Sequence, residues 1–334
     1  MQYKLEIQSL TKRFGEKTLF EDLNLTVTGP AILWAPSGWG KTTLLRILMG
    51  LEVPTSGTVS GVGRVGAVFQ EDRLCPQLNA VQNVELVLPE GKEQYKEQIE
   101  TDFIRFGLDR AALALPVRKL SGGQKRRAAL LRALWAESDT LLLDEPFAAL
   151  DSFLKWQLEQ EIARVLADFG GPCIWVSHDR DEVYRNCGPM CMMEAGKTQP
   201  PREKHQLFQD PRTPSAARLT GCKNFVDARP QGDTDLYLPP WDVVLHVNRP
   251  VPPDITQVGL GDGCMSFSPE EETDALSCQV IHAVEDVAAM ILLLRPMGSR
   301  EGAPLLRMEI PKEAWHGQTQ CTVYIRSPQA FLLA

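Results

Sequence analysis

The sequence predicts an α/β domain built on a mostly parallel sheet, followed by a small all-β domain. Short apolar runs such as 30–34 (PAILW) and 173–179 (CIWVSHD) alternate with stretches of helical periodicity, a pattern that is typical of strand–helix–strand units. A glycine-rich loop follows the first of these runs and leads into the helical stretch 43–51 (TLLRILMGL). After residue 222, Pro, Gly and Asp separate short candidate strands, and no long helix is evident.

The α/β domain is expected to cover residues 1–222. Its helical elements are a subdomain at about 71–135, which proline residues interrupt, and an amphipathic helix at 154–169. Its predicted strands are apolar runs bounded by polar or turn residues, at 3–8, 23–28, 30–34, 65–69, 140–146 and 173–179.

The second domain is expected to cover residues 223–334. Alternating strands of this kind can close a core of their own, so we expect a barrel-like accessory domain. Its candidate strands are 234–238, 243–247, 277–282, 289–294, 304–310 and 321–326.

Composition excludes several classes of protein. The formal net charge of −8 over 334 residues argues against nucleic acid as a partner. The sequence shows no run of eighteen apolar residues and no signal-peptide pattern at its start, so a cytosolic protein is expected. The eight cysteines are scattered without a C-x-x-C pair, which predicts reduced, mostly buried thiols.

The segment 35–43 (APSGWGKTT) has the pattern of a phosphate-binding loop. Its glycines let backbone N–H groups approach phosphate oxygens, and the helix that follows directs its N-terminus at them. Lys41 is placed to reach the β- and γ-phosphates as a catalytic cation, and Thr42 to ligate Mg²⁺. Ala35 stands where the pattern usually has its first glycine, and a methyl group there is expected to restrict the turn. The candidate ATP-binding residues of the loop are Ser37, Gly38, Trp39, Gly40, Lys41, Thr42 and Thr43.

Two acidic residues follow the apolar run 141–143. Asp144, at the end of the predicted strand, is a candidate Mg²⁺ ligand through the water shell of the ion, and Glu145 is a candidate general base for an attacking water. Acidic residues at strand ends are common, but downstream of a phosphate-binding loop the pair indicates nucleotide hydrolysis.

The segment 120–124 has the sequence LSGGQ, and with it the chain resembles the ATP-binding cassette (ABC) family of transporter ATPases over about residues 3–222. The resemblance implies a RecA-like P-loop NTPase cassette that hydrolyses ATP. In the family, this segment of one subunit caps the ATP held by the other subunit, with its hydroxyl, glycine amides and helix N-terminus facing the γ-phosphate. It therefore implies a homodimer, in which the further ATP-binding candidates are Ser121, Gly122, Gly123 and Gln124.

Four further residues match the family's order of motifs. Gln70 resembles the residue that senses Mg²⁺ and the attacking water, so it is a candidate for both catalysis and metal binding. Asp151 and the two residues before it resemble the family's loop that crosses the dimer interface. His178 resembles the switch histidine that contacts the γ-phosphate. Phe14 resembles the aromatic residue that lies against adenine, with Phe20 as a nearby alternative.

Importer cassettes of this family bind the cytoplasmic helices of a permease through the helical subdomain. The resemblance thus implies membrane permease subunits as partners, an extracytoplasmic substrate-binding protein as an indirect partner, and a peripheral position at the cytoplasmic face of the membrane. The segment 71–74 (EDRL) is our candidate permease contact, and an ordinary solvated loop is the alternative.

The transported substrate is open between two groups of importers. The stretch 69–74 (FQEDRL) resembles the nitrate, sulfonate and taurine group, whereas 149–162, 176–187 and 215–225 resemble molybdate importer ATPases, which carry a C-terminal β-barrel. We favour molybdate or a related oxyanion, with a second domain that either senses the anion or supports the dimer. A regulatory ABC ATPase without a permease is the alternative of another class.

Overall fold

The computed structural model describes residues 4–35, 38–88, 92–148, 150–186, 188–194 and 197–334. The chain divides into two compact units, residues 1–204 and 205–334. Helices α8 (Lys204–Gln209) and α9 (Pro214–Leu219) lie at the start of the second unit. The boundary that we predict after residue 222 falls beyond these helices.

The first unit contains a sheet whose central strands are parallel. Its strands are β3 (Pro30–Trp34), β5 (Val65–Val68), β6 (Thr140–Asp144), β7 (Cys173–Val176), β8 (Pro189–Glu194), β9 (Lys197–Thr198) and β10 (Arg202–Glu203). They follow the order β10-β8-β3-β7-β6-β5, with β9 paired to β8; β3, β5, β6, β7 and β8 pair in parallel, and β9 and β10 are antiparallel to β8. Every residue of β6 and β7 is buried, which explains why both appear as uninterrupted apolar runs. The predicted α/β architecture is confirmed.

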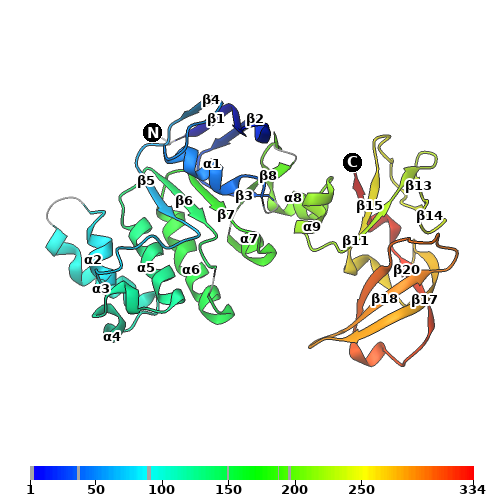
Figure 1. Ribbon diagram of the computed structural model, residues 1–334. Helices are drawn as coiled ribbons and strands as arrows, with labels where there is room; N and C mark the ends of the chain where they lie inside the picture. The colour runs from blue at the N-terminus through cyan, green and yellow to red at the C-terminus, as the bar shows by residue number, and fades with distance from the viewer. Residues whose placement is uncertain (1–3, 36–37, 89–91, 149, 187, 195–196) are drawn as a thin grey trace. The chain divides into compact units, whose positions relative to one another are not determined.

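A second, antiparallel sheet covers the helix that follows the glycine-rich loop. It consists of β1 (Leu5–Phe14), β2 (Lys17–Val27) and β4 (Ser56–Ser60) in the order β2-β1-β4, and α1 (Lys41–Leu48) lies between it and the parallel sheet (Figure 1). The β1–β2 hairpin is longer than the strands predicted at 3–8 and 23–28. Register shifts near Ser9 and Asp22, both with positive φ, break the alternation of apolar and polar residues that a sequence pattern needs.

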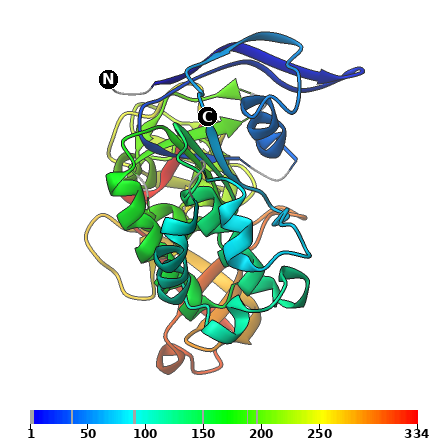
Figure 2. The ribbon, with the colours of Figure 1, turned by 90° about the vertical axis from the view of Figure 1, so that its left-hand side faces the viewer.

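The helical subdomain forms where it is predicted. Its elements are α2 (Ala80–Glu85), η1 (Lys92–Tyr95), α3 (Lys96–Arg105), α4 (Arg110–Leu113), η2 (Val117–Lys119) and α5 (Gly122–Leu134). Helices α2 and α5 both begin with a reciprocal capping box, Asn79 with Gln82 and Ser121 with Gln124. In both views α2, α3 and α4 lie at the opposite end of the first unit from the antiparallel sheet (Figures 1 and 2).

Partly buried ion pairs join α6 (Ser152–Asp168) to α7 (Arg180–Asn186) and to the segment before it. The Lys155 ammonium lies 2.6 Å from the Asp179 carboxylate and 2.9 Å from that of Glu182. Arg185 donates two hydrogen bonds to the fully buried Glu159, at 2.7 and 3.0 Å. These pairs fix the segment after β7 against the start of α6.

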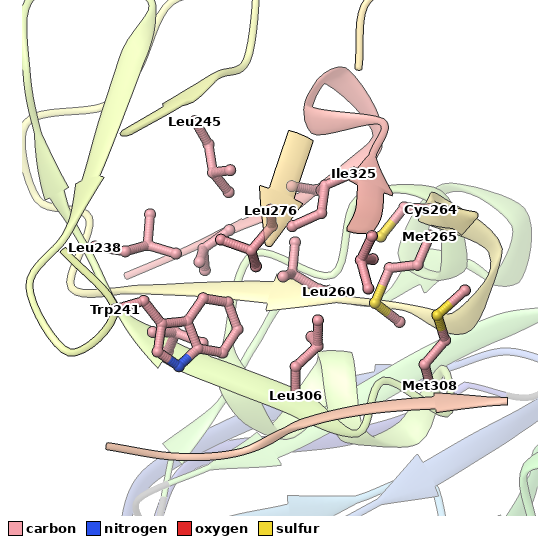
Figure 3. Packing of buried hydrophobic residues seen from close by; sticks show 14 of the residues in the cluster. Leu238, Trp241, Leu245, Leu260, Cys264, Met265, Leu276, Leu306, Met308 and Ile325 are labelled. Atoms are coloured by element: carbon pink, nitrogen blue, oxygen red, sulfur yellow. The ribbon is translucent and has the colours of Figure 1, made fainter. Parts of the chain in front are cut away.

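The second unit consists mainly of antiparallel strands around one core. Its strands are β11 (Asn224–Asp227), β12 (Arg229–Pro230), β13 (Asp235–Leu238), β14 (Val243–His246), β15 (Gln257–Leu260), β16 (Met265–Ser266), β17 (Asp274–Glu285), β18 (Met290–Pro296), β19 (Leu306–Ile310), β20 (Gln320–Ile325) and β21 (Phe331–Leu333). They form three sheets, β11-β15-β21, β12-β13-β14 and β16-β20-β17-β18-β19. Trp241 packs in the shared core beside Leu238, Leu260 and Leu306 (Figure 3). All six predicted strands are present, and the barrel-like second domain is confirmed.

Most of the described cysteines are buried. Cys75 is exposed, and burial raises the pKa of Cys191, Cys264 and Cys278 to about 12. Cys187 lies outside the described residues. No helix in the described part of the chain has both the length and the apolar character that crossing a bilayer requires.

Candidate functional site

The glycine-rich loop joins the end of β3 to the start of α1. Gly38 and Gly40 have φ angles of 83° and 87°, a left-handed conformation that favours glycine, and Gly40 forms the N-cap of α1. A Cβ at Gly40 would lie 2.7 Å from side-chain carbons of Leu19, so the loop also needs glycine there for space. Ser37 lies outside the described residues, and its role stays a prediction.

Ala35 follows β3 directly, at the start of the glycine-rich loop. Its φ lies outside the left-handed region, and its methyl group is buried in the core of the first unit. Its carbonyl oxygen accepts a hydrogen bond from the Lys41 ammonium at 2.6 Å. The backbone at Ala35 itself therefore does not need the conformational freedom of glycine, and the effect of the methyl group on the turn stays a prediction, because residues 36 and 37 lie outside the described part of the chain.

Asp144 and Thr42 meet at the wall of the site. The Thr42 hydroxyl donates to the Asp144 carboxylate at 3.0 Å, and Asp144 is 4% exposed at the end of β6. Burial raises the pKa of Asp144 above its ordinary value, although the Thr42 hydrogen bond and the nearby Lys41 oppose the shift. Burial likewise lowers the pKa of Lys41. Both groups are thus held in a poorly solvated site. A bound cation would stabilise the charged form of Asp144, and a bound anion would stabilise that of Lys41.

Glu145 follows Asp144 and turns away from the strand. Its φ is 49°, and its backbone N–H donates to the carbonyl oxygen of Val176 at 2.9 Å, which ties it to the end of β7. Its carboxylate lies 3.0 Å from Nδ1 of His178. The two side chains that the sequence assigns to base and γ-phosphate contact are therefore hydrogen-bonded to each other.

These residues line a hollow of about 360 Å³. Its lining is Leu19, Gly38, Gly40, Lys41, Thr42, Thr43, Gln70, Asp144 and Glu145. Eight of the residues that the sequence predicts to bind ATP or Mg²⁺, or to catalyse ATP hydrolysis, thus meet in one place: Gly38, Gly40, Lys41, Thr42, Thr43, Gln70, Asp144 and Glu145.

A second hollow of about 380 Å³ lies beside the first and shares Gly38 and Leu19 with it. Its wall includes Trp39 and two cations that the sequence did not reveal, Lys17 and Lys197. Lys197 reaches this place through β9, where Thr198 exchanges hydrogen bonds with Asn24 of β2 at 3.2 and 2.6 Å. Because this contact joins segments far apart in the chain, no local pattern could have indicated it.

Besides His178, which is hydrogen-bonded to Glu145, three groups of predicted residues do not line the described part of either hollow. The segment 121–124 forms the capped start of α5, where Ser121 and Gly122 are exposed. Asp151 caps α6 by accepting from the Leu154 N–H at 3.0 Å. Phe14 is 51% exposed at the end of β1, with the Lys12 ammonium 4.6 Å from its ring centre. Within one chain these residues are therefore not brought to the hollow that the loop and the acidic pair line.

Comparisons with known proteins agree with this geometry. Residues 22–148 match the family model described as "ABC transporter". The chain is 38% identical over 195 residues to the aliphatic sulfonates import ATP-binding protein of Nocardia farcinica, covering 58% of this chain and 79% of that protein. It is 33% identical over 237 residues to an Fe(3+) ions import ATP-binding protein of Haemophilus influenzae, covering 65% of this chain and 66% of that protein.

A solved structure shares the fold of the first unit. It is an ATP-binding cassette, determined as a dimer in a post-hydrolysis state with ADP and Pi bound, at a TM-score of 0.53 and 25% identity. The match covers 60% of this chain and 98% of that one. With the loop of Lys41, the acidic pair of Asp144 and Glu145, and the LSGGQ segment at the start of α5 in place, the chain belongs to the ABC transporter family of ATP-binding proteins and is an ATPase.

Proposed function

We propose that this chain is the ATP-hydrolysing subunit of an ABC importer and that it works as a homodimer. The observation that carries the proposal is the division of the site. The phosphate-binding loop and the acidic pair line one hollow, whereas Ser121 and its neighbours are exposed at the start of α5. A second copy could supply the missing donors, and the dimeric cassette among the solved structures supports that arrangement.

The residues of the hollow suit the hydrolysis of ATP to ADP and phosphate. The Lys41 ammonium would bind the β- and γ-phosphates, and Glu145 would accept a proton from the attacking water. Gln70 lines the same hollow, and His178 is hydrogen-bonded to Glu145, so both can position groups around the bond that breaks.

The donor set also fits Mg²⁺. The Thr42 hydroxyl and the Asp144 carboxylate are hard oxygen ligands, which this ion prefers. Among the described residues no group of three or more His, Cys, Asp or Glu side chains is arranged to hold a metal by itself. The ion would therefore take its other ligands from phosphate and water, and its charge would offset that of the phosphates.

The permease would bind beside the segment 71–74. An apolar hollow of about 320 Å³ lies next to it, lined by Met49, Leu51, Val65, Gly66, Ala67, Phe69, Val87, Arg132, Ala133 and Ala136. Arg132 of α5 holds the segment by donating to the carbonyl oxygens of Arg73 at 2.7 Å and Asp72 at 3.3 Å. Leu51 is 53% exposed at the rim. A peripheral position at the cytoplasmic face of the membrane follows, and an extracytoplasmic binding protein would reach this chain only through the permease.

We propose an oxyanion, molybdate first, as the transported substrate. Two features support molybdate. The sequence of the stretches 149–162, 176–187 and 215–225 is the basis on which we favour molybdate importer ATPases, which carry a C-terminal β-barrel, and the second unit of this chain is barrel-like. Aliphatic sulfonates are the second candidate, because the relative at 38% identity is a sulfonate importer protein. That match covers 58% of this chain, so it gives little information about the second domain.

The second domain would regulate transport or support the dimer. Every residue that we assign to ATP hydrolysis lies in the first unit. A chain that ends at residue 222 should then still hydrolyse ATP in the assembled transporter. If molybdate slows ATP hydrolysis in the full-length complex but not in the truncated one, the second domain senses the anion. An equal response of both complexes would leave the domain a supporting role.

The homodimer is tested with Glu145→Gln, which keeps the phosphate-binding loop but removes the base. We expect the variant to bind Mg-ATP while hydrolysing it only at a small residual rate, and to elute as a dimer in size-exclusion chromatography at micromolar concentration. Lys41→Ala is the control, because it removes the cation that binds phosphate and should show no ATP-dependent shift. A Glu145→Gln protein that stays monomeric with ATP, alone and with its permease, would contradict the shared site.

The substrate is tested by reconstituting the chain in vesicles with a permease and a binding protein whose genes lie next to the gene of this chain. Molybdate or tungstate on the binding protein should stimulate ATP hydrolysis, and an alkyl sulfonate should not. Stimulation by the sulfonate alone would establish the second candidate. The absence of any neighbouring permease gene would favour a regulatory ATPase instead.

A further inference from the structure

Arg126 occupies an unusual position between three parts of the site. It lies in α5, two residues after the LSGGQ segment, and is 2% exposed. Its guanidinium faces the backbone at the end of β6, where Nε donates to the carbonyl oxygen of Pro146 at 2.9 Å. Nη2 donates to the carbonyl oxygens of Asp144, at 2.8 Å, and of Glu145. One side chain thus holds three consecutive carbonyl groups of the acidic segment.

The same guanidinium also binds the segment that follows β5. Nη1 donates to the carbonyl oxygen of Phe69, which immediately precedes Gln70, and lies 3.4 Å from the Asp72 carboxylate. All three guanidinium nitrogens of Arg126 are therefore used. The helix that begins with the signature, the acidic pair and the segment of Gln70 are joined through a single group.

This arrangement requires arginine. A guanidinium presents five N–H donors in a flat fork that can reach two backbone segments at once. A lysine ammonium has a single nitrogen and cannot lie between both segments. Burial lowers the pKa of Arg126, and the Asp72 carboxylate is the largest opposing influence. A buried cation held mainly by carbonyl groups is costly unless the hydrogen bonds keep their geometry.

The contact fixes the residue on which hydrolysis depends. Glu145 has a φ of 49°, a conformation that is unfavourable for a residue with a Cβ and needs support from its surroundings. Its N–H is held by Val176 and its carbonyl oxygen by Arg126, so its backbone is fixed on both sides. The direction of the Glu145 carboxylate then depends on the position of α5.

We propose that Arg126 is a positioning residue for ATP hydrolysis: it couples the position of the signature helix α5 to the orientation of Glu145 and to the segment of Gln70. The inference rests on the proposed function, in which Glu145 is the base. When the signature at the start of α5 engages the ATP held by a second copy, movement of α5 reaches the chain's own acidic pair through this guanidinium.

The test uses Arg126→Lys and Arg126→Gln in the full chain, with Arg127→Lys as the matched control. Arg127 is the next residue of α5 and is also buried, but it donates to the carbonyl oxygens of Phe106, Gly107 and Gly123 rather than to the acidic segment. All three variants should lose thermal stability to a similar extent. Only the Arg126 variants should lower kcat, by about 10- to 100-fold, with KM and the Kd for ATP changed less than about threefold.

Two outcomes would overturn the proposal. One is an unchanged kcat in Arg126→Gln that folds and binds ATP. The other is an equal loss of kcat in Arg127→Lys, which would show that any weakened packing of α5 has this effect. The Gln variant keeps the test available if the Lys variant does not fold, because Gln removes the charge as well as the fork.

A second measurement separates this proposal from the proposed function. In single-turnover hydrolysis, Arg126→Gln should lower the rate strongly in the wild-type background and less than about twofold when added to Glu145→Gln, because the group it positions is already gone. A full effect in both backgrounds would contradict positioning through Glu145. Full activity of Glu145→Gln alone would instead refute the base assignment, on which the proposed function depends.

Discussion

The two sides of the ATP site differ in how far one chain completes them. On the phosphate-loop side, Lys41, Thr42, Asp144 and Glu145 all make contacts across elements, to Ala35, to each other and to His178. On the signature side, the Ser121 hydroxyl accepts a hydrogen bond from the Gln124 N–H of its own helix, at 3.3 Å, and Ser121 is exposed. The first side is organised before ligand binds, whereas the second is organised only locally.

This difference between the two sides indicates which substitutions affect a single chain and which affect only a pair of chains. Residues that are cross-linked by hydrogen bonds lose little freedom when ATP binds, so their loss should be visible in binding by a single chain. Residues of the signature side should matter only once a second copy is present. Substitutions on the two sides of the site should therefore differ in their effect on a single chain.

Lys41→Ala should have the largest effect. It removes the cation that we propose binds the transferred phosphate, together with the hydrogen bond to Ala35. We expect hydrolysis to fall on the order of 10³-fold and ATP binding by the isolated chain to weaken strongly. Fluorescence titration with an ATP analogue measures the binding, and near-normal affinity in the variant would contradict the assignment of the loop.

Ser121→Ala should act only between chains. The same capping box occurs in α2, where Asn79 and Gln82 exchange the same pair of hydrogen bonds as Ser121 and Gln124. Asn79→Ala is therefore a matched control, and each variant should lose about 1 kcal/mol of stability from the missing cap. Only Ser121→Ala should lower hydrolysis, by about 10- to 100-fold, with ATP binding by the isolated chain unchanged.

Steady-state rates, thermal melts and ATP titrations of the two variants give the comparison. Equal losses of hydrolysis would show that the cap merely supports the helical subdomain. A loss of ATP affinity in isolated Ser121→Ala would place the signature in the site of its own chain, against the division that the structure shows.

The elements that the sequence predicted well share one property: burial on both faces. The runs at 140–146 and 173–179 contain β6 and β7, and their apolar stretches 141–143 and 173–176 have no polar residue. The strand β15 was missed because Gly259 weakens its pattern. A Cβ there would lie 3.1 Å from the Cys222 sulfur, a close approach that only the folded structure reveals.

The candidate site divides in the same way. Gly40, Lys41, Asp144 and Glu145 were found because their motifs are contiguous in the chain, and local geometry follows from such motifs. The contacts of Arg126 with carbonyl groups of two other segments depend on tertiary packing alone. Sequence reasoning therefore locates the reacting groups better than the groups that position them.

The two units each contain a histidine paired with a carboxylate, and only one pair lies at the site. His178 lies 3.0 Å from Glu145, whereas His246 in the second unit lies 2.6 Å from Asp274. The Asp274 carboxylate also accepts a hydrogen bond from the buried Ser327 hydroxyl. The hydrogen bond from Asp274, aided by its charge and that of Asp235, raises the pKa of His246 above its ordinary value near 6.5.

His246→Gln should have the smallest effect, and only on stability. Because the pKa of His246 is raised in the folded chain, its charged form stabilises the fold fully at pH values below about 6.5, and this contribution is lost as the pH rises through the folded-state pKa. The pair is mostly exposed, so the difference in Tm between wild type and variant should be on the order of 1 °C at pH 5.5 and smaller at pH 8.5. Thermal melts at both values measure it. A larger difference in Tm at pH 8.5 than at pH 5.5 would reverse the expected pH dependence and show that His246 acts through packing. A change in the rate of ATP hydrolysis by the isolated chain would link the second unit to a site that contains none of its residues.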